Sequence, residues 1–173
     1  MPSRCRHCHD RPTVLYIDGC CFDNGRRNPV AGIGVRWEEG LSRRNLADIL
    51  TGKQTNNRAE VAAAVTALNQ CREKDVWCVV LRTDSQLLFD TVYHYYYKWE
   101  EGGDYSFQTS DGEVPANLNL LHDLMDLKRE MCMKIEKVDA HAGIKGNEEA
   151  DELARRGAGK HRHHKNPGYC DCY

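Results

Sequence analysis

The most constraining stretch of this sequence is residues 14–21, where an apolar and partly β-branched run leads into a single acid, Asp18, followed by a glycine. This pattern predicts a buried strand that carries one carboxylate. An ionised carboxylate in a strand core is costly unless it is paired or coordinates a metal ion. Taken alone, Asp18 fits equally well as an acid that caps a turn at a strand end. Three further acids, Glu60, Asp84 and Asp151, occupy comparable positions, and we expect the four to meet around metal ions.

The hydrophobic periodicity predicts an α/β domain. The expected elements are strands at 13–21, 31–37 and 46–50, a helix at 55–71, a strand from 76 to Asp84, helices at 85–95 and 115–130, a strand at 133–138 and a helix from 147. Three strands joined as hairpins and then a strand–helix–strand order favour a mixed sheet. Gly32 and Gly34 lie on one face of the second strand, so another segment should approach that face closely.

The length of 173 residues suggests one compact domain with short tails. We expect a Cys- and His-containing arm at 1–12, a catalytic domain at 13–158, and a basic, flexible tail that begins near Gly157 and is assigned to 159–173. The net charge of −2 means that nucleic acid would be bound through a local patch or metal ions. No apolar run reaches the length of a membrane span, and no secretory signal is evident, so an intracellular protein with reduced thiols is expected, in the nucleus, the cytoplasm or an organelle.

Five segments carry a resemblance to a known family. They begin at Tyr16 (YIDGCC), Asn24 (NGRRNPVAGIGV), Lys53 (KQTNNRAE), Arg82 (RTDS) and His141 (HAGIKGNEEADELA). In this order and at this spacing, the chain resembles the cellular type 1 ribonucleases H over roughly residues 13–158. The resemblance implies a ribonuclease H-like fold, with a five-stranded mixed sheet of three antiparallel strands and then two parallel strands, flanked by helices.

The resemblance also implies that Asp18, Glu60, Asp84 and Asp151 are the catalytic, metal-binding carboxylates. Ligands that are all oxygen suit hard cations, so two Mg²⁺ ions are expected, with Mn²⁺ as a substitute. Two such ions about 4 Å apart clamp an in-line displacement at phosphorus, one activating the attacking water and the other stabilising the leaving 3′-oxygen. The implied reaction is endonucleolytic hydrolysis of the RNA strand of RNA–DNA hybrids, which leaves 5′-phosphate and 3′-hydroxyl ends. His141 is the implied mobile histidine that assists proton transfer or product release.

The substrate contacts implied by the resemblance fall into two sets. Those expected to face the RNA strand, where a 2′-hydroxyl distinguishes RNA from DNA, are Cys20, Cys21, Asn24, Asn56 and Asn57. Those expected to face the DNA strand are Lys53, Thr55, Tyr95, Trp99, Ser110 and Asn117. Asn24 and Asn56 also fit ordinary turn and helix-capping chemistry. A loop that is basic in many relatives contains Glu100, Glu101 and Asp104 here, which predicts weaker hybrid binding because acids repel a phosphate backbone.

Two other functions use the same residues. One is a DNA nuclease or strand-transfer enzyme on the same fold, and the other is a module that binds hybrids without cutting them. The expected assembly is a monomer that takes an RNA–DNA hybrid duplex and no membrane. In the tails, Cys5, Cys8, Cys170 and Cys172 could bind zinc if both ends met, but each tail carries only part of a ligand set, so disordered tails are favoured.

Overall fold

The computed structural model describes residues 11–38, 40–95 and 117–165. In chain order the elements are β1 (Thr13–Phe22), β2 (Val30–Trp37), η1 (Ser42–Arg44), β3 (Leu46–Ile49), α1 (Asn56–Glu73), β4 (Cys78–Thr83), α2 (Gln86–Asp90), η2 (Thr91–Tyr95), α4 (Leu118–Glu130), β5 (Cys132–Lys137) and α5 (Lys145–Lys165). Each strand and helix expected from the sequence is present. The expected helix at 85–95 is divided into the short α-helix α2 and the π-helical turn η2.

The strands form one five-stranded sheet in the order β3-β2-β1-β4-β5. β1, β2 and β3 pair antiparallel, whereas β4 pairs parallel to both β1 and β5. This is the predicted mixed sheet. The pairing of β1 with β4 begins at Thr13 and Val79 and ends at Tyr16 and Arg82. Beyond that point β1 continues to Phe22 beside β2 alone, so the sheet opens next to Asp18.

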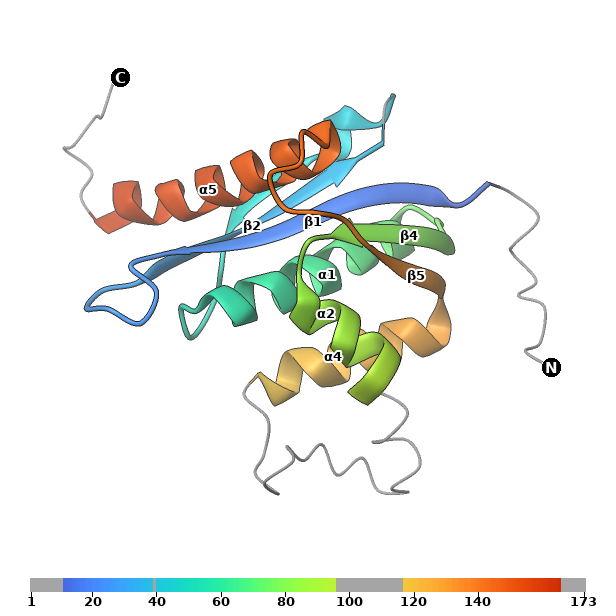
Figure 1. Ribbon diagram of the computed structural model, residues 1–173, viewed down its shortest axis with the longest axis horizontal. Coiled ribbons are helices and arrows are strands. Elements are labelled where there is room, and N and C mark those ends of the chain that lie inside the picture. Colours follow the sequence, from blue (N-terminus) through green and yellow to red (C-terminus); the bar gives the residue numbers. More distant parts are fainter. Residues whose placement is uncertain (1–10, 39, 96–116, 166–173) are drawn as a thin grey trace.

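Helices cover the two faces of the sheet unequally (Figure 1). α5 lies on one face, over β1, β2 and β3, while α1 packs on the other face with α4 against it. The two glycines of β2 explain how α5 comes so close, because a Cβ at Gly32 would lie 2.1 Å from the Ala158 nitrogen and one at Gly34 would lie 2.2 Å from the Ala150 oxygen. The close approach predicted for this face is therefore confirmed.

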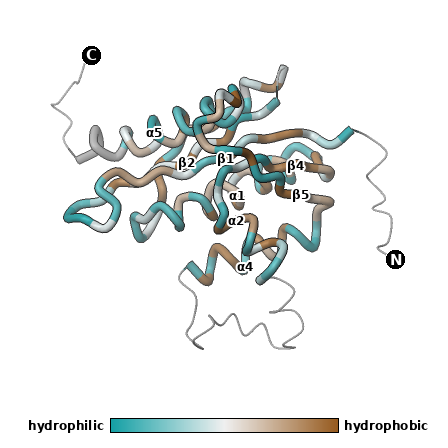
Figure 2. The backbone as a smooth tube through the Cα atoms, in the orientation of Figure 1, coloured by the Kyte–Doolittle hydropathy of each residue, from teal (hydrophilic) through white to brown (hydrophobic). Residues whose placement is uncertain are grey.

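The hydrophobic core fills the space between the sheet and α1 and α4. Its largest fully buried side chains are Trp37, Leu15, Ile17, Leu68, Leu81, Leu88, Leu124, Met125, Ile135, Val35, Val61 and Val79. Burial of each large apolar side chain contributes about 1.5–3 kcal/mol. Figure 2 shows hydrophobic colour along β4 and hydrophilic colour at the turn between β1 and β2. The loops and strand ends that carry the polar residues are thus anchored to a packed core.

Two expectations need correction. The tail expected to be flexible from Gly157 instead continues α5 to Lys165. Gly157 and Ala158 are buried, because a helix backbone packs onto the glycines of β2 and onto β3 there. The alternative in which Asp18 caps a turn at a strand end is also wrong, because Asp18 lies inside β1 opposite Gly34 of β2. No helix within the described part of the chain has the length and apolar character needed to span a membrane.

Candidate active site

Asp18 and Asp84 line the same cleft near the end of β4. Continuing the β1–β4 register past Tyr16 and Arg82 brings Asp18 opposite Asp84, the first residue after β4. Asp18 Oδ1 accepts a hydrogen bond from its neighbour Gly19 N at 2.8 Å. Asp84 Oδ2 accepts one from Asn147 Nδ2 at 3.0 Å. The two carboxylates are therefore fixed by the sheet and by separate donors.

Glu60 reaches the same place from the first turns of α1. Its Oε1 accepts from Asn56 Nδ2 at 3.0 Å, and its Oε2 accepts from the Ser85 hydroxyl. Gly19 makes this approach possible, because a Cβ there would lie 2.3 Å from the Glu60 nitrogen. Ser85 also caps α2 through Leu88 N, so one hydroxyl connects the start of α2 with Glu60.

Asp151 comes from α5, on the opposite face of the sheet. Both of its carboxylate oxygens accept from Arg155 Nε at 2.9 Å, an i,i+4 ion pair on the helix surface. The sequence reasoning did not single out Arg155, although an acid followed four residues later by a base on a helix is a recognisable signal. Asp151 is thus already paired with the guanidinium of Arg155 where it lines the site.

One cleft of about 360 Å³ collects these groups. Its lining includes the four carboxylates together with Cys20, Cys21, Asn56, His141, Asn147, Glu148 and Arg155. Burial raises the pKa of Asp18 from its ordinary value of 3.8 to about 8, and the negative charges of Asp84 and Asp151 add to the increase. Burial also raises the pKa of Glu60, against the Ser85 hydrogen bond that lowers it. The ionised forms of Asp18 and Glu60 are therefore disfavoured in the cleft.

This donor set fits divalent cations. Four carboxylates that repel each other gain from a shared cation, and all-oxygen ligands match the preference of Mg²⁺ and related hard ions. Within the described residues, no three His, Cys, Asp or Glu side chains already converge as a finished ligand set. Protein donors bind three of the carboxylates: Asn147 binds Asp84, Ser85 and Asn56 bind Glu60, and Arg155 binds Asp151.

The two thiols of the cleft are poorly suited to act as nucleophiles. Burial, followed by the nearby charge of Asp18, raises the pKa of Cys20 to about 11. Burial also raises the pKa of Cys21. The reactive form of cysteine is the thiolate, which these shifts disfavour.

His141 and Asn147 flank the cleft from the loop that leads into α5. His141 is exposed and has a φ of 54°, a left-handed conformation that histidine adopts more readily than bulky residues do. Asn147 is 4% exposed, and while its Nδ2 holds Asp84, its Oδ1 is buried without a hydrogen-bond partner. The sequence indicated Asn147 only as a helix start. Its contact with Asp84, 63 residues away in the chain, depends on the packing of α5 on β1 and β2.

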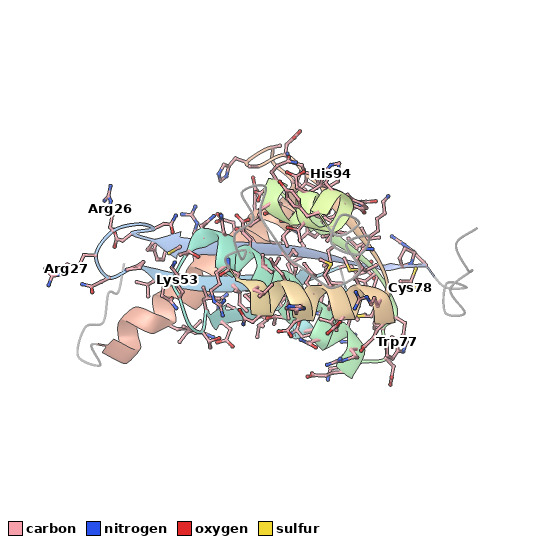
Figure 3. The ribbon with its side chains drawn as sticks, turned by 90° about the horizontal axis from the view of Figure 1, so that it is seen from below. Arg26, Arg27, Lys53, Trp77, Cys78 and His94 are labelled. Atoms are coloured by element: carbon pink, nitrogen blue, oxygen red, sulfur yellow. The ribbon has the colours of Figure 1, made fainter. Side chains whose placement is uncertain are left out.

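The other residues expected at the RNA strand lie beside the cleft. Asn24, in the β1–β2 loop, uses its Oδ1 to accept from Asn56 N at 3.3 Å, which ties that loop to the start of α1. Asn57 is exposed in the first turn of α1. Figure 3 shows Arg26 and Arg27 extending from the tip of the β1–β2 loop. Amides and cations therefore stand together on one side of the carboxylates.

Two of the residues expected at the DNA strand, Thr55 and Asn117, contact an arginine that sequence reasoning missed. Thr55 caps α1 by accepting from Arg58 N at 3.3 Å. The Arg58 guanidinium donates to Asn117 Oδ1 at 3.4 Å and to Asn119 Oδ1 at 3.1 Å, so it joins the starts of α1 and α4. Lys53 is exposed on the preceding loop (Figure 3). A fixed cation among small polar groups can bind a phosphate.

Tyr95 is 43% exposed at the end of η2. Trp99, Ser110 and the acidic residues Glu100, Glu101 and Asp104 lie outside the described residues, and so do the four cysteines proposed for zinc. The expectations that rest on them stay predictions.

Comparison with known proteins agrees with this architecture. The family model of RNase H matches residues 10–159. The chain is similar to ribonuclease H1 of Homo sapiens, with 41% identity over 145 residues that cover 84% of this chain and 49% of that protein. It is also similar to ribonuclease H of Maricaulis maris, with 35% identity over 149 residues that cover 86% of this chain and 95% of that protein.

A solved structure shows the same likeness. The structure described as LC9-RNase H1, a type 1 RNase H with the type 2 active-site motif, superposes with a TM-score of 0.66 at 25% identity, covering 87% of this chain and 75% of that one. The chain spans about half the length of the mammalian relatives it matches. The family match over residues 10–159, the five-stranded mixed sheet and the relatives together place the chain: it belongs to the RNase H family.

Proposed function

We propose that this chain hydrolyses the RNA strand of RNA–DNA hybrids. The observation that carries the proposal is the convergence of Asp18, Glu60, Asp84 and Asp151, from four separate elements, on one cleft. Burial and mutual repulsion raise the pKa of Asp18 to about 8, which is the situation that a bound cation would relieve. Membership of the RNase H family supports the same reaction.

The four carboxylates would hold the divalent cations, which we infer to be Mg²⁺ with Mn²⁺ as a substitute. When bound, these cations supply positive charge at the reacting phosphate. The chain supplies the rest. Asn147 and Ser85 keep Asp84 and Glu60 oriented, and exposed His141 can carry a proton at the mouth of the cleft.

Selection of RNA would take place beside the cleft. Asn56 Nδ2 is engaged by Glu60, so its Oδ1 is the atom that would accept a hydrogen bond from a 2′-hydroxyl. Because Asn24 holds Asn56 through its main chain, the two residues act as one recognition unit. The Arg58 guanidinium, with Thr55 and Asn117, would hold a phosphate of the DNA strand.

A substrate panel tests the proposal. Labelled RNA–DNA, RNA–RNA and DNA–DNA duplexes of one sequence are incubated with Mg²⁺, Mn²⁺ or EDTA. The proteins are the wild type, Asp18→Asn and, as a matched control, Glu130→Gln, because the exposed ion pair of Glu130 with Arg72 joins α4 to α1 outside the cleft. We expect metal-dependent cutting of RNA in the hybrid alone, lost in Asp18→Asn and kept in Glu130→Gln.

The same panel separates the alternatives. Cutting of the DNA–DNA duplex would replace the proposal with a DNA nuclease or strand-transfer enzyme. Hybrid binding without cutting in either metal ion would indicate a binding module whose carboxylates do not assemble into a working site.

A further inference from the structure

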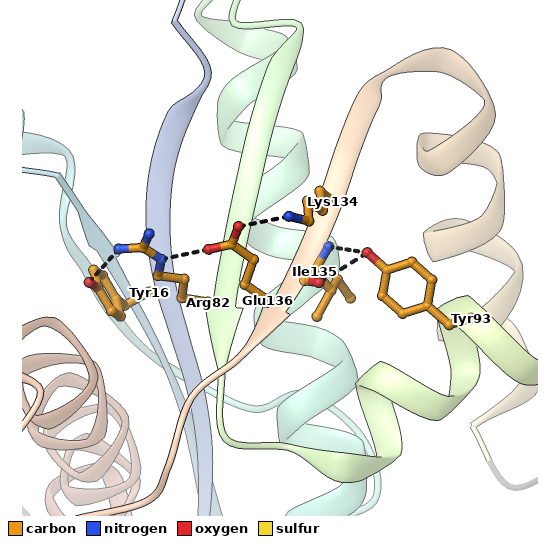
Figure 4. A network of polar contacts seen from close by, with 6 residues as sticks. All are labelled: Tyr16, Arg82, Tyr93, Lys134, Ile135 and Glu136. Carbon is orange, nitrogen blue, oxygen red and sulfur yellow. Dashed lines mark hydrogen bonds and ion pairs between the residues drawn. The ribbon is translucent and has the colours of Figure 1, made fainter. Parts of the chain in front are cut away.

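One hydroxyl group satisfies both main-chain groups of Ile135. Tyr93 Oη donates to the Ile135 oxygen and accepts from the Ile135 nitrogen, each at 3.0 Å (Figure 4). β5 is the last strand of the sheet, so among the described residues no strand lies along its outer edge. A tyrosine hydroxyl has one donor and can accept as well, which is what one residue of an edge strand requires.

Tyr93 lies in the middle of the π-helical turn η2, directly after α2. π turns are rare and occur frequently at functional sites. The extra residue in the turn changes the direction of the side chains beyond it. Thr91 and Val92 are buried, whereas His94 extends outward (Figure 3) and Tyr95 is 43% exposed. Among the described residues, Tyr95 is the exposed large hydrophobic side chain.

The segment from Ser85 to Tyr95 is attached at both ends. At its start, Ser85 donates to Glu60 in the carboxylate cleft, and the Gln86 side chain accepts from Lys137 Nζ of β5. Near its end, the ring of Phe89 packs against Tyr93 with centroids 4.8 Å apart. The two Tyr93–Ile135 hydrogen bonds form the second attachment to β5. These attachments therefore limit how far Tyr95 can move relative to Asp84.

We propose that Tyr93 is a positioning residue for hybrid binding. Its paired hydrogen bonds to Ile135 hold η2 in the π conformation and so present Tyr95 at a fixed offset from Asp84. The inference rests on the proposed function and on the expectation from the sequence that Tyr95 faces the DNA strand. Without the hydroxyl, the π turn can relax towards an α-helix, whose turn contains one residue fewer. The side chains beyond the turn would then rotate about the helix axis by about 100°. Tyr95 would then leave the position from which it meets the substrate.

The test uses Tyr93→Phe, which keeps the ring against Phe89 and removes both hydrogen bonds. Steady-state cleavage of a hybrid in Mg²⁺ is measured for the wild type, Tyr93→Phe, Tyr95→Ala and the double variant. We expect Tyr93→Phe to raise KM about three- to tenfold, the range that corresponds to loss of a modest polar interaction, with kcat within about twofold. In the Tyr95→Ala background the same change should have almost no further effect on KM.

A matched control lies on the same strand. Glu136→Gln breaks the ion pairs with Arg82 and Lys134 but leaves the Tyr93 contacts intact, and should keep the wild-type KM. Faster amide hydrogen exchange at Ile135 and at residues 91–95 in Tyr93→Phe, and not in Glu136→Gln, would support the relaxed turn independently of activity.

Three results would overturn the inference. Tyr93→Phe with an unchanged KM would show that η2 keeps its place without the hydroxyl. Effects of Tyr93→Phe and Tyr95→Ala that multiply in the double variant would show that Tyr93 acts by another route, such as closing the sheet edge. A wild-type protein that does not cleave hybrids would overturn the proposed function itself, and because this appears without any variant, the two failures are distinguishable.

Discussion

Two charged clusters lie two residues apart along the same pair of strands. One pairs opposite charges, and the other gathers like charges. Tyr16 and Asp18 share one face of β1, and Arg82 is followed two positions later by Asp84. At the first pair, the Arg82 guanidinium donates to Tyr16 Oη at 2.9 Å and to Glu136 at 3.0 Å (Figure 4). At the second pair, two carboxylates line one cleft, and the negative charge of Asp84 raises the pKa of Asp18.

The pKa shifts express this difference. Hydrogen bonds from Lys134 and Arg82 lower the pKa of Glu136, so that carboxylate is stabilised in its charged form. Burial and like charges raise the pKa of Asp18 to about 8, so that carboxylate is destabilised when charged. We call the first cluster (Tyr16, Arg82, Lys134 and Glu136) the compensated cluster, because its opposite charges pair with each other. The carboxylate cluster gathers like charges and is therefore suited to bind a cation.

The largest expected difference between the clusters is in activity. Asp84→Asn should lower kcat for hybrid cleavage by at least about a thousandfold, because it removes a cation ligand at the reacting phosphate. Glu136→Gln, an identical chemical change in the compensated cluster, should stay within about twofold of wild type. Single-turnover cleavage measures both. Equal losses in the two variants would remove the functional distinction between the clusters.

The next largest effect is on the pH dependence of stability. Between the ordinary pKa of 3.8 and the folded-state pKa of about 8, folded Asp18 keeps a proton that the unfolded chain has released. In EDTA, the free energy of unfolding should therefore fall by about 3 kcal/mol as the pH rises through this range, a value reduced from the full shift because Asp18 is partly exposed. Urea titrations measure it, and Asp18→Asn should flatten the curve.

Glu136 supplies the opposite sign as an internal comparison. Its lowered pKa means that its contribution is present above its ordinary pKa of 4.5 and is lost as the pH falls below that value. Asp18→Asn should leave this acid-side loss in place. A stability curve of Asp18→Asn that still falls between pH 4 and about pH 8 would assign the effect to other groups.

A smaller effect is expected at Arg155, the cation that already occupies both oxygens of Asp151. Arg155→Met should lower the Mg²⁺ concentration for half-maximal thermal stabilisation about two- to threefold, because a competing positive charge is removed. Melting temperatures across a Mg²⁺ titration measure this without any substrate. A higher Mg²⁺ requirement would instead mean that Arg155 orients Asp151 for the cation.

The smallest effect is the stability lost when the compensated cluster is broken. The Arg82–Glu136 pair is about one-third exposed on each side chain. Glu136→Gln should therefore lower the free energy of unfolding by only about 0.5 kcal/mol, and salt should reduce the difference further. Urea unfolding at low and high salt measures it. A loss several times larger would show that this network supports the sheet more strongly than an exposed ion pair can.

Local patterns were enough to predict most of the fold. Alternation and apolar runs located five strands, and the pair Gly32 and Gly34 correctly indicated a close approach to β2. The end of α5 was misjudged because the residues after Gly157 are basic and lack an apolar stripe, and a helix on this face packs by small residues against glycine instead. The π turn at η2 was not foreseen, because the sequence at 85–95 predicts one continuous helix.

Residue type and hydrophobic period are local properties, so they predicted on which elements the acids of this chain lie, while the family resemblance singled out four of them. How those acids meet is a property of the tertiary structure. The pairing of β1 with β4 stops at Tyr16 and Arg82, so the sheet opens beside Asp18, and Glu60 from one face and Asp151 from the other reach the same cleft. The contact of Asn147 with Asp84 shows the physical reason, because it joins residues far apart in the chain whose meeting depends on how α5 packs on β1 and β2.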